Sequence, residues 1–529
     1  MIISINNKIN ITIICALIAL TGCTKEEQTI ATSQAQSQIS FNSFTEWCEQ
    51  KSTLPKEMKH TVEVLLEKSG TQDCQQANKI LNNFTELDIR GSKISNLKPL
   101  SGFTNLTKLY LGYNNKISDL EPLSNLTNLT SLRLEQNQIN DIKSLANLTK
   151  LTWLEIHRNK ISDLKPLANL TNLTELSLEE NKISDLKPLT NLTNLTRLRL
   201  NENQITDLKP LANLTNLTGL SLGENQISDI KPLSSLTRLN YLYLGRNRIS
   251  DLKPIADLTN LTSLYLWNNK INDIKPLINL TNLTRLTVSN NQISDISPIV
   301  SFTKLNSLAI GSNRISDIKP ISTLNKLISL EIHNNQINDL KPLTNLTKLY
   351  VLVIGSNQIS DLKPLTNLTT LTELRLKNNQ IEDLKPLSSL TNLESLSLSQ
   401  NQISNLKPLS NLTKLRTLYL QANKISDLKP LSNLTNLERL FLEMNQISDL
   451  KPLSSLTSLT GLHLKKNQIS NVEPLSSLTK LTWLNLNYNQ ISDVKPLSSL
   501  TNLNSLYLVE NKFSFFSKHC PVKGLSCQF

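Results

Sequence analysis

The chain has 529 residues, carries a formal net charge of +12 and is only 4% aromatic. Its length exceeds that of a usual single domain, but one repeat fills most of it and leaves no room for a second globular domain. The basic charge does not indicate nucleic acid, because a lysine recurs six residues after most of the repeat asparagines, two residues beyond an equally regular column of aspartates. Such a mixed stripe is typical of a solvated surface, so we expect no nucleic-acid partner.

Residues 1–22 have the composition of a cleaved export signal. Lys8 precedes an apolar run of about a dozen residues, which is too short to span a bilayer. The run ends in Leu20-Thr21-Gly22-Cys23, which resembles the lipobox of bacterial lipoproteins. This resemblance implies that Cys23 is diacylated and becomes the mature N-terminus. An ordinary signal peptide that ends in Gly-Cys is the alternative.

Residues 23–40 are polar after the cysteine and nearly free of bulky apolar side chains, which is typical of a flexible tether. Two or more acyl chains hold a protein firmly on a membrane where one chain does not. We therefore expect an exported protein, held by its lipid on the cell membrane or outer membrane of a bacterial envelope.

Residues 41–83 break the repeat and have helical periodicity, so we expect a small helical N-terminal cap. One helix is predicted to begin near Pro55 and to stop at Gly70. A second, short helix is predicted to carry Cys74. The cap would cover the apolar end that the first repeat otherwise exposes to water.

Of the six cysteines, Cys15 is removed with the signal and Cys23 is predicted to carry lipid. Two remain at each end of the repeat array: Cys48, Cys74, Cys520 and Cys527. Even numbers that flank an array of an exported protein predict one disulfide in each cap. A four-cysteine metal site would require the two ends of the array to meet, so we expect no metal.

Residues 84–512 follow one template, L-x-x-L-x-L-x-x-N-x-I-x-D-L-K-P-L-x-x-L. Its asparagine recurs every 22 residues from Asn137 to Asn511, and Asn115 extends the series to 19 positions. The L-x-L segment alternates as a strand does, so its leucines should point inward and the intervening residues outward. Strands from successive turns can only stack parallel, so 19 or 20 strands at ~4.8 Å spacing predict an array of about 90 Å.

The template is that of a leucine-rich repeat, and with the motif "NQISDLKPL" it resembles the internalin type of bacterial leucine-rich repeat. The resemblance implies an α/β repeat solenoid, a horseshoe with a long parallel sheet on its concave face and 3₁₀ or irregular turns on its convex side. An extra residue in "GYNNK", where Asn114 fits the upstream register and Asn115 the downstream one, predicts a bulge or a widened turn.

The polar columns have structural interpretations. The recurring asparagine should satisfy backbone groups at the turn after the strand, and the aspartate column should cap a short 3₁₀ turn. Asparagine replaces the aspartate at Asn96, Asn405 and Asn471, so an acceptor is needed there more than a charge. Residues 513–529 are predicted to form a C-terminal cap, with Phe513, Phe515 and Phe516 covering the last repeat.

The outward strand positions vary from repeat to repeat, and eight of the nine tyrosines and three of the four tryptophans fall there. Exposed aromatics on a rigid surface are typical anchors of protein interfaces. Packing against cross-strand neighbours is the alternative for each single residue. The strongest predicted binding patch is formed by Tyr241, Tyr243, Tyr265 and Trp267 on neighbouring repeats, with Arg246 and Arg285 nearby. Four further aromatics are predicted to bind ligand on the same face: Trp153, Tyr419, Phe441 and Trp483.

Catalysis has little support. His157 and His333 are eight repeats apart, so they cannot share a metal or form a dyad, and no phosphate loop, zinc spacing or nucleophile motif is present. We therefore expect no cofactor and a monomeric protein that binds a protein or peptide ligand on the concave face. A structural or carbohydrate-binding role in the envelope, with aromatics stacking on sugars, is the alternative.

Overall fold

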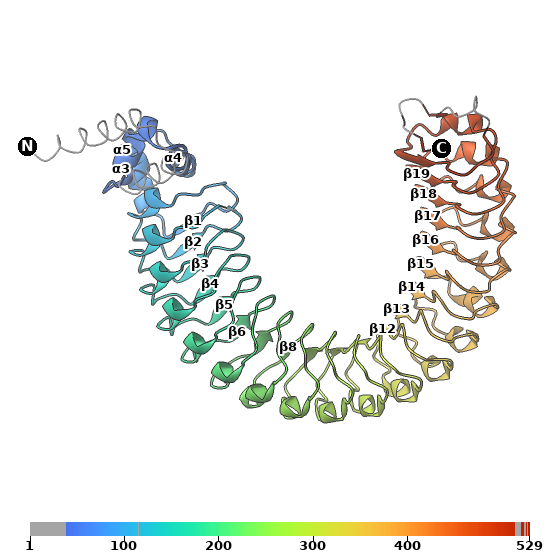
Figure 1. Ribbon diagram of the computed structural model, residues 1–529, viewed down its shortest axis with the longest axis horizontal. Coiled ribbons are helices and arrows are strands. Elements are labelled where there is room, and N and C mark those ends of the chain that lie inside the picture. The colour runs from blue at the N-terminus through green and yellow to red at the C-terminus, as the bar shows by residue number, and fades with distance from the viewer. Residues whose placement is uncertain (1–38, 115, 514–519, 523–524, 526, 529) are drawn as a thin grey trace, which may run out of the picture. The chain divides into compact units, whose positions relative to one another are not determined.

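The computed structural model describes residues 39–114, 116–513, 520–522, 525 and 527–528. The predicted signal, most of the tether, Asn115, Phe515 and Phe516 therefore lie outside the described residues. By its internal contacts the chain divides into two compact units, residues 1–216 and 217–529, which are described separately. In each unit the strands lie on the inner side of an arc and the 3₁₀ turns on its outer side (Figure 1).

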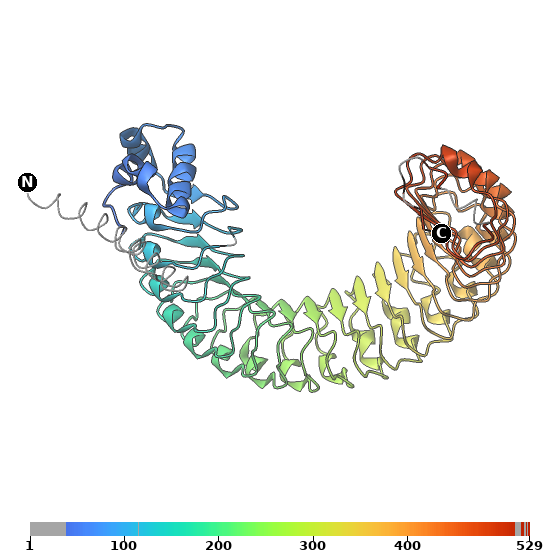
Figure 2. The same cartoon turned by 45° about the horizontal axis from the view of Figure 1, so that its top comes forward.

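The described residues of the first unit begin with three α-helices: α3 (Phe44–Glu49), α4 (Lys56–Ser69) and α5 (Cys74–Asn82) (Figure 2). Helix α4 begins after Pro55 and ends at Gly70, whose φ of 73° is the left-handed conformation that stops a helix. Helix α5 begins at Asp73, whose carboxylate accepts a hydrogen bond from the Gln76 amide at 2.7 Å. Both predicted helices are confirmed, and the sequence analysis missed the short helix α3.

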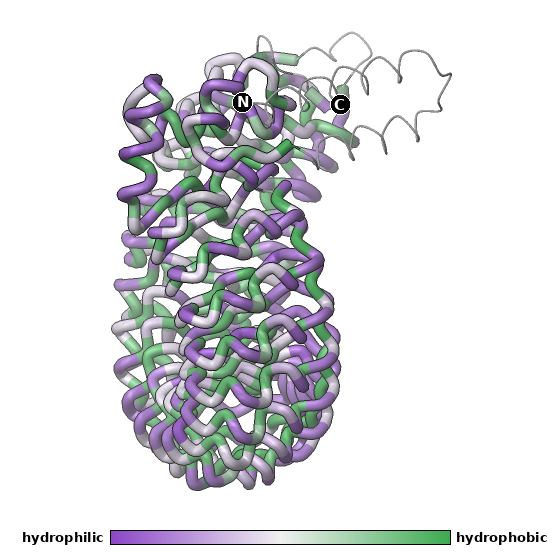
Figure 3. Tube along the Cα trace, turned by 90° about the vertical axis from the view of Figure 1, so that its left-hand side faces the viewer, coloured by the Kyte–Doolittle hydropathy of each residue, from purple (hydrophilic) through white to green (hydrophobic). Residues whose placement is uncertain are grey.

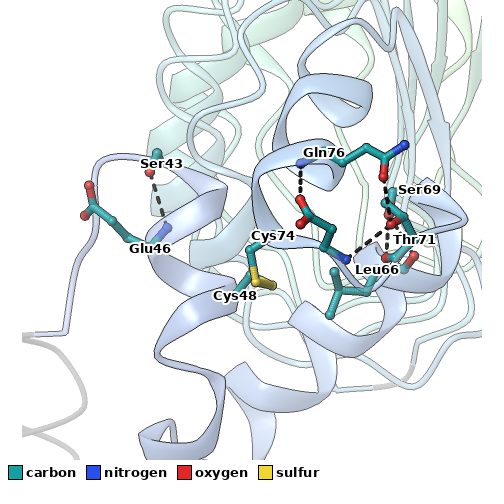
Figure 4. Close-up of a disulfide and its surroundings, with 9 residues drawn as sticks. Ser43, Glu46, Cys48, Leu66, Ser69, Thr71, Cys74 and Gln76 are labelled. Atoms are coloured by element: carbon teal, nitrogen blue, oxygen red, sulfur yellow. Dashed lines mark hydrogen bonds between the residues drawn. A yellow bond between two sulfur atoms is a disulfide. The ribbon is translucent and has the colours of Figure 1, made fainter.

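The helical cap is fixed internally and against the first repeat. A disulfide joins Cys48 of α3 to Cys74 of α5 (Figure 4). On α4, the Thr61 hydroxyl donates a hydrogen bond to the Asn96 carbonyl at 2.7 Å, and the Met58 side chain is only 1% exposed. The cap therefore covers the apolar end of the first repeat, as the sequence predicted.

The described residues form 20 strands of three residues each, six in the first unit and fourteen in the second. The first unit contains β1 (Glu86–Asp88), β2 (Lys108–Tyr110), β3 (Ser131–Arg133), β4 (Trp153–Glu155), β5 (Glu175–Ser177) and β6 (Arg197–Arg199). The second contains β7 (Gly219–Ser221), β8 (Tyr241–Tyr243), β9 (Ser263–Tyr265), β10 (Arg285–Thr287), β11 (Ser307–Ala309), β12 (Ser329–Glu331), β13 (Val351–Val353), β14 (Glu373–Arg375), β15 (Ser395–Ser397), β16 (Thr417–Tyr419), β17 (Arg439–Phe441), β18 (Gly461–His463), β19 (Trp483–Asn485) and β20 (Ser505–Tyr507). Within each unit, successive strands pair parallel and place equivalent residues of successive repeats side by side.

The core of each repeat consists of leucine and isoleucine columns. The middle residue of every strand is a leucine at most 2% exposed, and the two residues that flank it point outward. Figure 3 shows hydrophobic and hydrophilic segments interspersed along the tube. Short 3₁₀ turns, from η2 (Lys98–Leu100) to η20 (Lys495–Ser499), close the outer side, and the proline column lies at their starts.

The asparagine column is a hydrogen-bonded ladder. The Asn291 amide donates to the carbonyls of Leu266, Val288 and Ser289 at 3.0–3.2 Å, and its oxygen accepts from the Ile271 amide at 2.9 Å. One side chain thus satisfies backbone groups of two successive repeats. This confirms the predicted role of the column.

The extra residue in "GYNNK" follows the ladder position of the second repeat. Asn114 is 2% exposed and donates to the Leu111 carbonyl at 2.7 Å, as a ladder asparagine does. The next ladder asparagine is Asn137, which accepts from the Ile117 amide at 3.2 Å. The upstream register therefore ends at Asn114, and the insertion lies between Asn114 and Ile117.

The acceptor column acts at the 3₁₀ turns. The Asp163 carboxylate accepts a hydrogen bond from the first amide of η5, that of Lys165, at 2.9 Å. Asn405 does the same for the Lys407 amide at 2.9 Å, which confirms that an acceptor is needed more than a charge. Both hydrogen bonds hold the backbone at the start of the 3₁₀ turn, four residues after the buried isoleucine of the repeat.

The C-terminal residues cover the last strand of the second unit. Tyr507 of β20 forms a parallel bridge with Gln528, and the Leu508 amide donates to the Gln528 carbonyl at 2.7 Å. A disulfide joins Cys520 to Cys527 in the same segment. These contacts pair part of the edge strand, which leaves fewer of its backbone groups open to another chain.

Candidate functional site

The aromatic residues that the sequence assigned to a binding surface lie on the strand face. Tyr241 is 37% exposed, and the other predicted aromatics on these strands are half-buried. The buried members of the same strands are the leucines between them, such as Leu242 and Leu264, which are 0% exposed. The rings are therefore accessible on the face that varies from repeat to repeat.

Tyr241, Tyr243, Tyr265 and Trp267 form one group in the second unit, the tyrosine–tryptophan patch. Strands β8 and β9 pair with Tyr243 opposite Tyr265. The Tyr265 ring centroid is 5.5 Å from that of Tyr241 and 5.7 Å from that of Tyr243, with interplanar angles of 48° and 43°. Tilted rings at these separations attract each other and restrict each other's rotamers, so the patch is a preorganised surface.

Two glycines of the preceding repeats make room for the patch. A Cβ atom at Gly223 would overlap the Tyr243 ring, and one at Gly245 would overlap the Trp267 indole. The two rings thus lie over the backbone of the neighbouring repeat instead of standing away from it. Sequence analysis missed these glycines, although each precedes its aromatic by 20 or 22 residues, the spacing of lateral neighbours in this fold.

Of the two arginines predicted near the patch, one contacts it. The Arg246 guanidinium carbon lies 4.9 Å from the Trp267 ring centroid, and Arg246 Nη1 is 2.9 Å from Glu224 Oε2. Arg285 is exposed at the start of β10, in register with Ser263, while Thr287 occupies the position opposite Tyr265. Arg246 therefore adds charge to the edge of the patch, and Arg285 borders it one strand away.

A second group extends over β16–β20 and is more continuous than the sequence indicated. We call Tyr419, Phe441, His463, Trp483 and Tyr507 the aromatic ladder. Successive ring centroids are 4.5, 4.2, 3.5 and 5.3 Å apart. The sequence analysis did not include His463, whose imidazole joins the two halves of the ladder.

Trp153 belongs to neither group. In the first unit, the Arg133 guanidinium carbon lies 4.4 Å from the Trp153 ring centroid and 5.2 Å from that of Tyr110. Arg133 Nε is also 3.4 Å from Glu155 Oε2. This cation between two rings is a separate polar and aromatic contact on β2–β4.

Glu135 is a buried carboxylate beside this contact. It is 3% exposed, and its Oε2 atom has no hydrogen-bond partner among the described residues. Burial raises the pKa of Glu135 above that of an ordinary glutamate, and the Glu155 carboxylate contributes in the same direction. The folded state thus favours the protonated form of Glu135.

Glu135→Gln should therefore raise the free energy of unfolding at neutral pH. A raised carboxyl pKa contributes stability below the unfolded-state pKa of ~4, and this contribution is lost as the pH rises through the folded-state pKa. The advantage of the variant should be absent near pH ~4 and grow toward pH ~7. Urea unfolding at the two pH values measures it, with the exposed Glu510→Gln as control. An equal effect at both pH values would contradict the assignment.

The described residues provide no metal centre, because no three His, Cys, Asp or Glu side chains among them gather closely enough to hold an ion. His157 Nδ1 lies 3.4 Å from the Ser177 hydroxyl, and the His333 ring lies over Gly311. Within the described part of the chain, no helix has the length and apolar character to cross a bilayer.

The comparisons with known proteins agree with this fold. A family model described as "Leucine Rich repeats (2 copies)" matches the chain in overlapping segments that together cover residues 82–147, 149–477 and 479–518. The chain therefore belongs to the leucine-rich-repeat family. Comparison with the sequences of curated proteins gives no match.

Among solved structures, the chain is similar to an internalin of Listeria monocytogenes, with 35% identity over 72% of this chain and 93% of that one, at a TM-score of 0.44. A leucine-rich-repeat protein of Leptospira interrogans is 28% identical over 74% of this chain and 96% of its own, at a TM-score of 0.58. Within its family, the protein thus resembles the bacterial internalins. The two disulfides are typical of an extracellular or surface protein, which folds in an oxidising compartment.

The ectodomain of the Arabidopsis thaliana receptor kinase GASSHO1/SCHENGEN3, solved in complex with CASPARIAN STRIP INTEGRITY FACTOR 2, shares the fold. Its TM-score is 0.63 at 23% identity, over 83% of this chain and 60% of the ectodomain. At this identity the likeness extends to the fold alone.

Proposed function

We propose that this protein binds a protein or peptide ligand on its strand face, with the tyrosine–tryptophan patch as the main anchor, and that it catalyses no reaction. The observation that carries the proposal is the contact of three tyrosine rings on the adjacent strands β8 and β9, with Trp267 two residues beyond Tyr265. Preorganised aromatics lose little conformational freedom on binding, and such residues dominate the energy of protein interfaces. The GASSHO1/SCHENGEN3 ectodomain was solved in complex with CASPARIAN STRIP INTEGRITY FACTOR 2, so the fold that it shares with this chain can hold such a partner.

The proposal predicts a large loss of binding when the patch is truncated. Tyr243→Ala combined with Trp267→Ala should abolish capture of the ligand in pull-downs from cells that present it, because two of the four aromatic anchors are removed. Tyr350→Ala is the matched control, since Tyr350 is 51% exposed but lies outside the strand face, two residues before Leu352 of β13. Equal capture by the double variant and the control would contradict the proposal.

A carbohydrate-binding role remains the second candidate. The outer faces of Tyr243 and Trp267, whose rings lie over glycines, are the geometry on which a sugar could stack. A polysaccharide ligand should be competed by soluble glycans, whereas a protein ligand should be removed by protease treatment of the ligand-bearing cells. These two outcomes separate the candidates in the same pull-down assay.

We also propose that the protein is exported and anchored to the bacterial envelope through lipid on Cys23. The support is the sequence Leu20-Thr21-Gly22-Cys23 after a short apolar run, together with the disulfides of an oxidising compartment. Cys23→Ser should shift the protein from the membrane fraction to the soluble or secreted fraction, because the acyl chains hold it on the membrane. Labelling with a radioactive fatty acid checks the modification. A labelled Cys23→Ser protein would contradict the proposed site.

A further inference from the structure

We propose that the aromatic ladder is a second binding surface, specific for an extended acidic segment of a peptide or protein. This inference deepens the proposed function, because it names a partner chemistry for another part of the same strand face. It is carried by two observations on β16–β20: which part of each ring the ladder presents, and which charges border it.

Two of the four neighbouring ring pairs of the aromatic ladder are stacked, and the other two, Phe441–His463 and Trp483–Tyr507, are tilted by 38° and 50°. Tyr419 and Phe441 stack with an interplanar angle of 14°, and His463 and Trp483 with one of 24°. Rings on neighbouring strands that stack at about the ~4.8 Å strand spacing cover each other's faces and direct their outer edges to solvent. The edge of an aromatic ring carries partial positive charge and its face partial negative charge. The ladder therefore favours oxygen acceptors over the flat apolar face of a sugar.

Basic side chains border the ladder on both sides. Arg439 is exposed at the start of β17, and Lys465 follows His463 by two residues. The Nζ atoms of Lys465 and Lys466 lie 5.2 and 5.6 Å from the ring centroid of Tyr488, which is 44% exposed. Tyr488 thus contacts both lysines beside the aromatic ladder.

The acidic groups on this part of the face are fewer, and two of them are engaged. At the outward positions of β16–β20 and at the two residues before each repeat asparagine, the carboxylates are Glu443 and Glu510, and Glu438, which directly precedes β17, pairs with Arg416. Glu443 Oε1 lies 3.0 Å from His463 Nδ1, and both side chains are 19% exposed. Apolar ring edges between basic side chains are complementary to a chain that carries carboxylates and apolar groups.

The test uses the full chain and a short fluorescent peptide that alternates glutamate and leucine, compared with the same peptide carrying glutamine for glutamate. By fluorescence anisotropy, the wild-type protein should bind the acidic peptide at least about tenfold more tightly, with an affinity that falls as salt increases. Lys465→Gln with Lys466→Gln should remove most of this preference. Lys326→Gln with Lys348→Gln, which removes two exposed turn lysines, should preserve it.

Trp483→Ala should weaken binding of both peptides by about tenfold, because it removes a ring on which each depends. Circular dichroism verifies its fold, and the lysine variants test the inference independently. Equal affinity of the wild-type protein for the two peptides, or an unchanged preference in the Lys465/Lys466 variant, would overturn it. If Tyr243→Ala with Trp267→Ala removes ligand capture but the variants of the aromatic ladder do not change peptide binding, the proposed function stands and the inference about the aromatic ladder fails. If neither set of variants affects ligand capture, the proposed function itself fails.

Discussion

Replacing Asn445 by leucine should destabilise the repeats around it by about 3–5 kcal/mol, one of the largest effects of any polar residue in the chain. The Asn445 amide donates to the carbonyls of Leu420, Leu442 and Glu443 at 3.0–3.3 Å. Its oxygen accepts from the Ile425 amide at 3.1 Å. Asn445 is 9% exposed, so these backbone groups would lose their partner with little access to water.

Asn445→Asp has nearly the same shape and separates the two functions of the side chain. A carboxylate can still accept from the Ile425 amide, but it cannot donate to the carbonyls and would repel them. We expect it to be at least as destabilising as leucine at neutral pH. The comparison tests whether the donor function of the ladder matters, because size and position do not change.

Urea unfolding measures both variants, and hydrogen exchange of the Ile425 amide reports the local effect. The control is Gln446→Leu, because Gln446 is exposed and adjacent. It should stay within about 0.5 kcal/mol of the wild type. If the loss of unfolding free energy at Asn445 is no larger than that at Gln446, the asparagine column does not stabilise the fold.

The sequence predicted the hydrogen-bonded asparagine column, the strands and the capped turns, because each of them depends on the residue type at one position of the repeat. A buried side chain with both a donor and an acceptor is required at one point of every turn, and only asparagine recurs there. The same reasoning placed Asp163 and Asn405 at the 3₁₀ turns. A strict period converts such local requirements into a complete solenoid.

A backbone feature of the same turn was not predictable. The residue before each ladder asparagine has positive φ, between 51° and 59° from Tyr113 to Glu510. Met444 and Tyr488 occupy this left-handed position, although neither favours it. The residue types in this column vary freely, so the conformation is imposed by the turn and leaves no signature in the sequence.

The geometry of the site was predictable only in part, because it depends on contacts between repeats. The period assigned Tyr243 and Tyr265 to adjacent positions on one face, and the structure places their rings in contact. It did not indicate that Gly245 makes room for Trp267, or that His463 joins Phe441 to Trp483. Those contacts depend on the side-chain rotamers of residues on neighbouring strands, and the residue types at equivalent positions of the repeat do not specify these rotamers.

Two neighbours on β9 should respond oppositely to alanine, and this tests the geometry on which the proposed function rests. Leu264→Ala should cost about 2–5 kcal/mol of stability, because Leu264 is 0% exposed and leaves a cavity in the core. Tyr265→Ala should cost about 1 kcal/mol, the scale of its ring contacts with Tyr241 and Tyr243, and should remove ligand capture. Successive strand residues point to opposite faces, so one change affects the core and the other the surface.

Urea unfolding and the pull-down assay are applied to both variants. We expect Leu264→Ala to lose stability and keep ligand capture, and Tyr265→Ala to keep most of its stability and lose ligand capture. Leu264→Ala should still capture ligand under conditions where circular dichroism shows it folded, because its side chain does not reach the strand face. Thr287→Ala, at the position opposite Tyr265 on β10, is the control for a small change on the same face and should affect neither measurement strongly. A large stability loss with Tyr265→Ala and unchanged capture would mean that the ring packs the sheet and binds nothing. In that case cross-strand packing, the alternative that the sequence left open for each aromatic, would account for the patch.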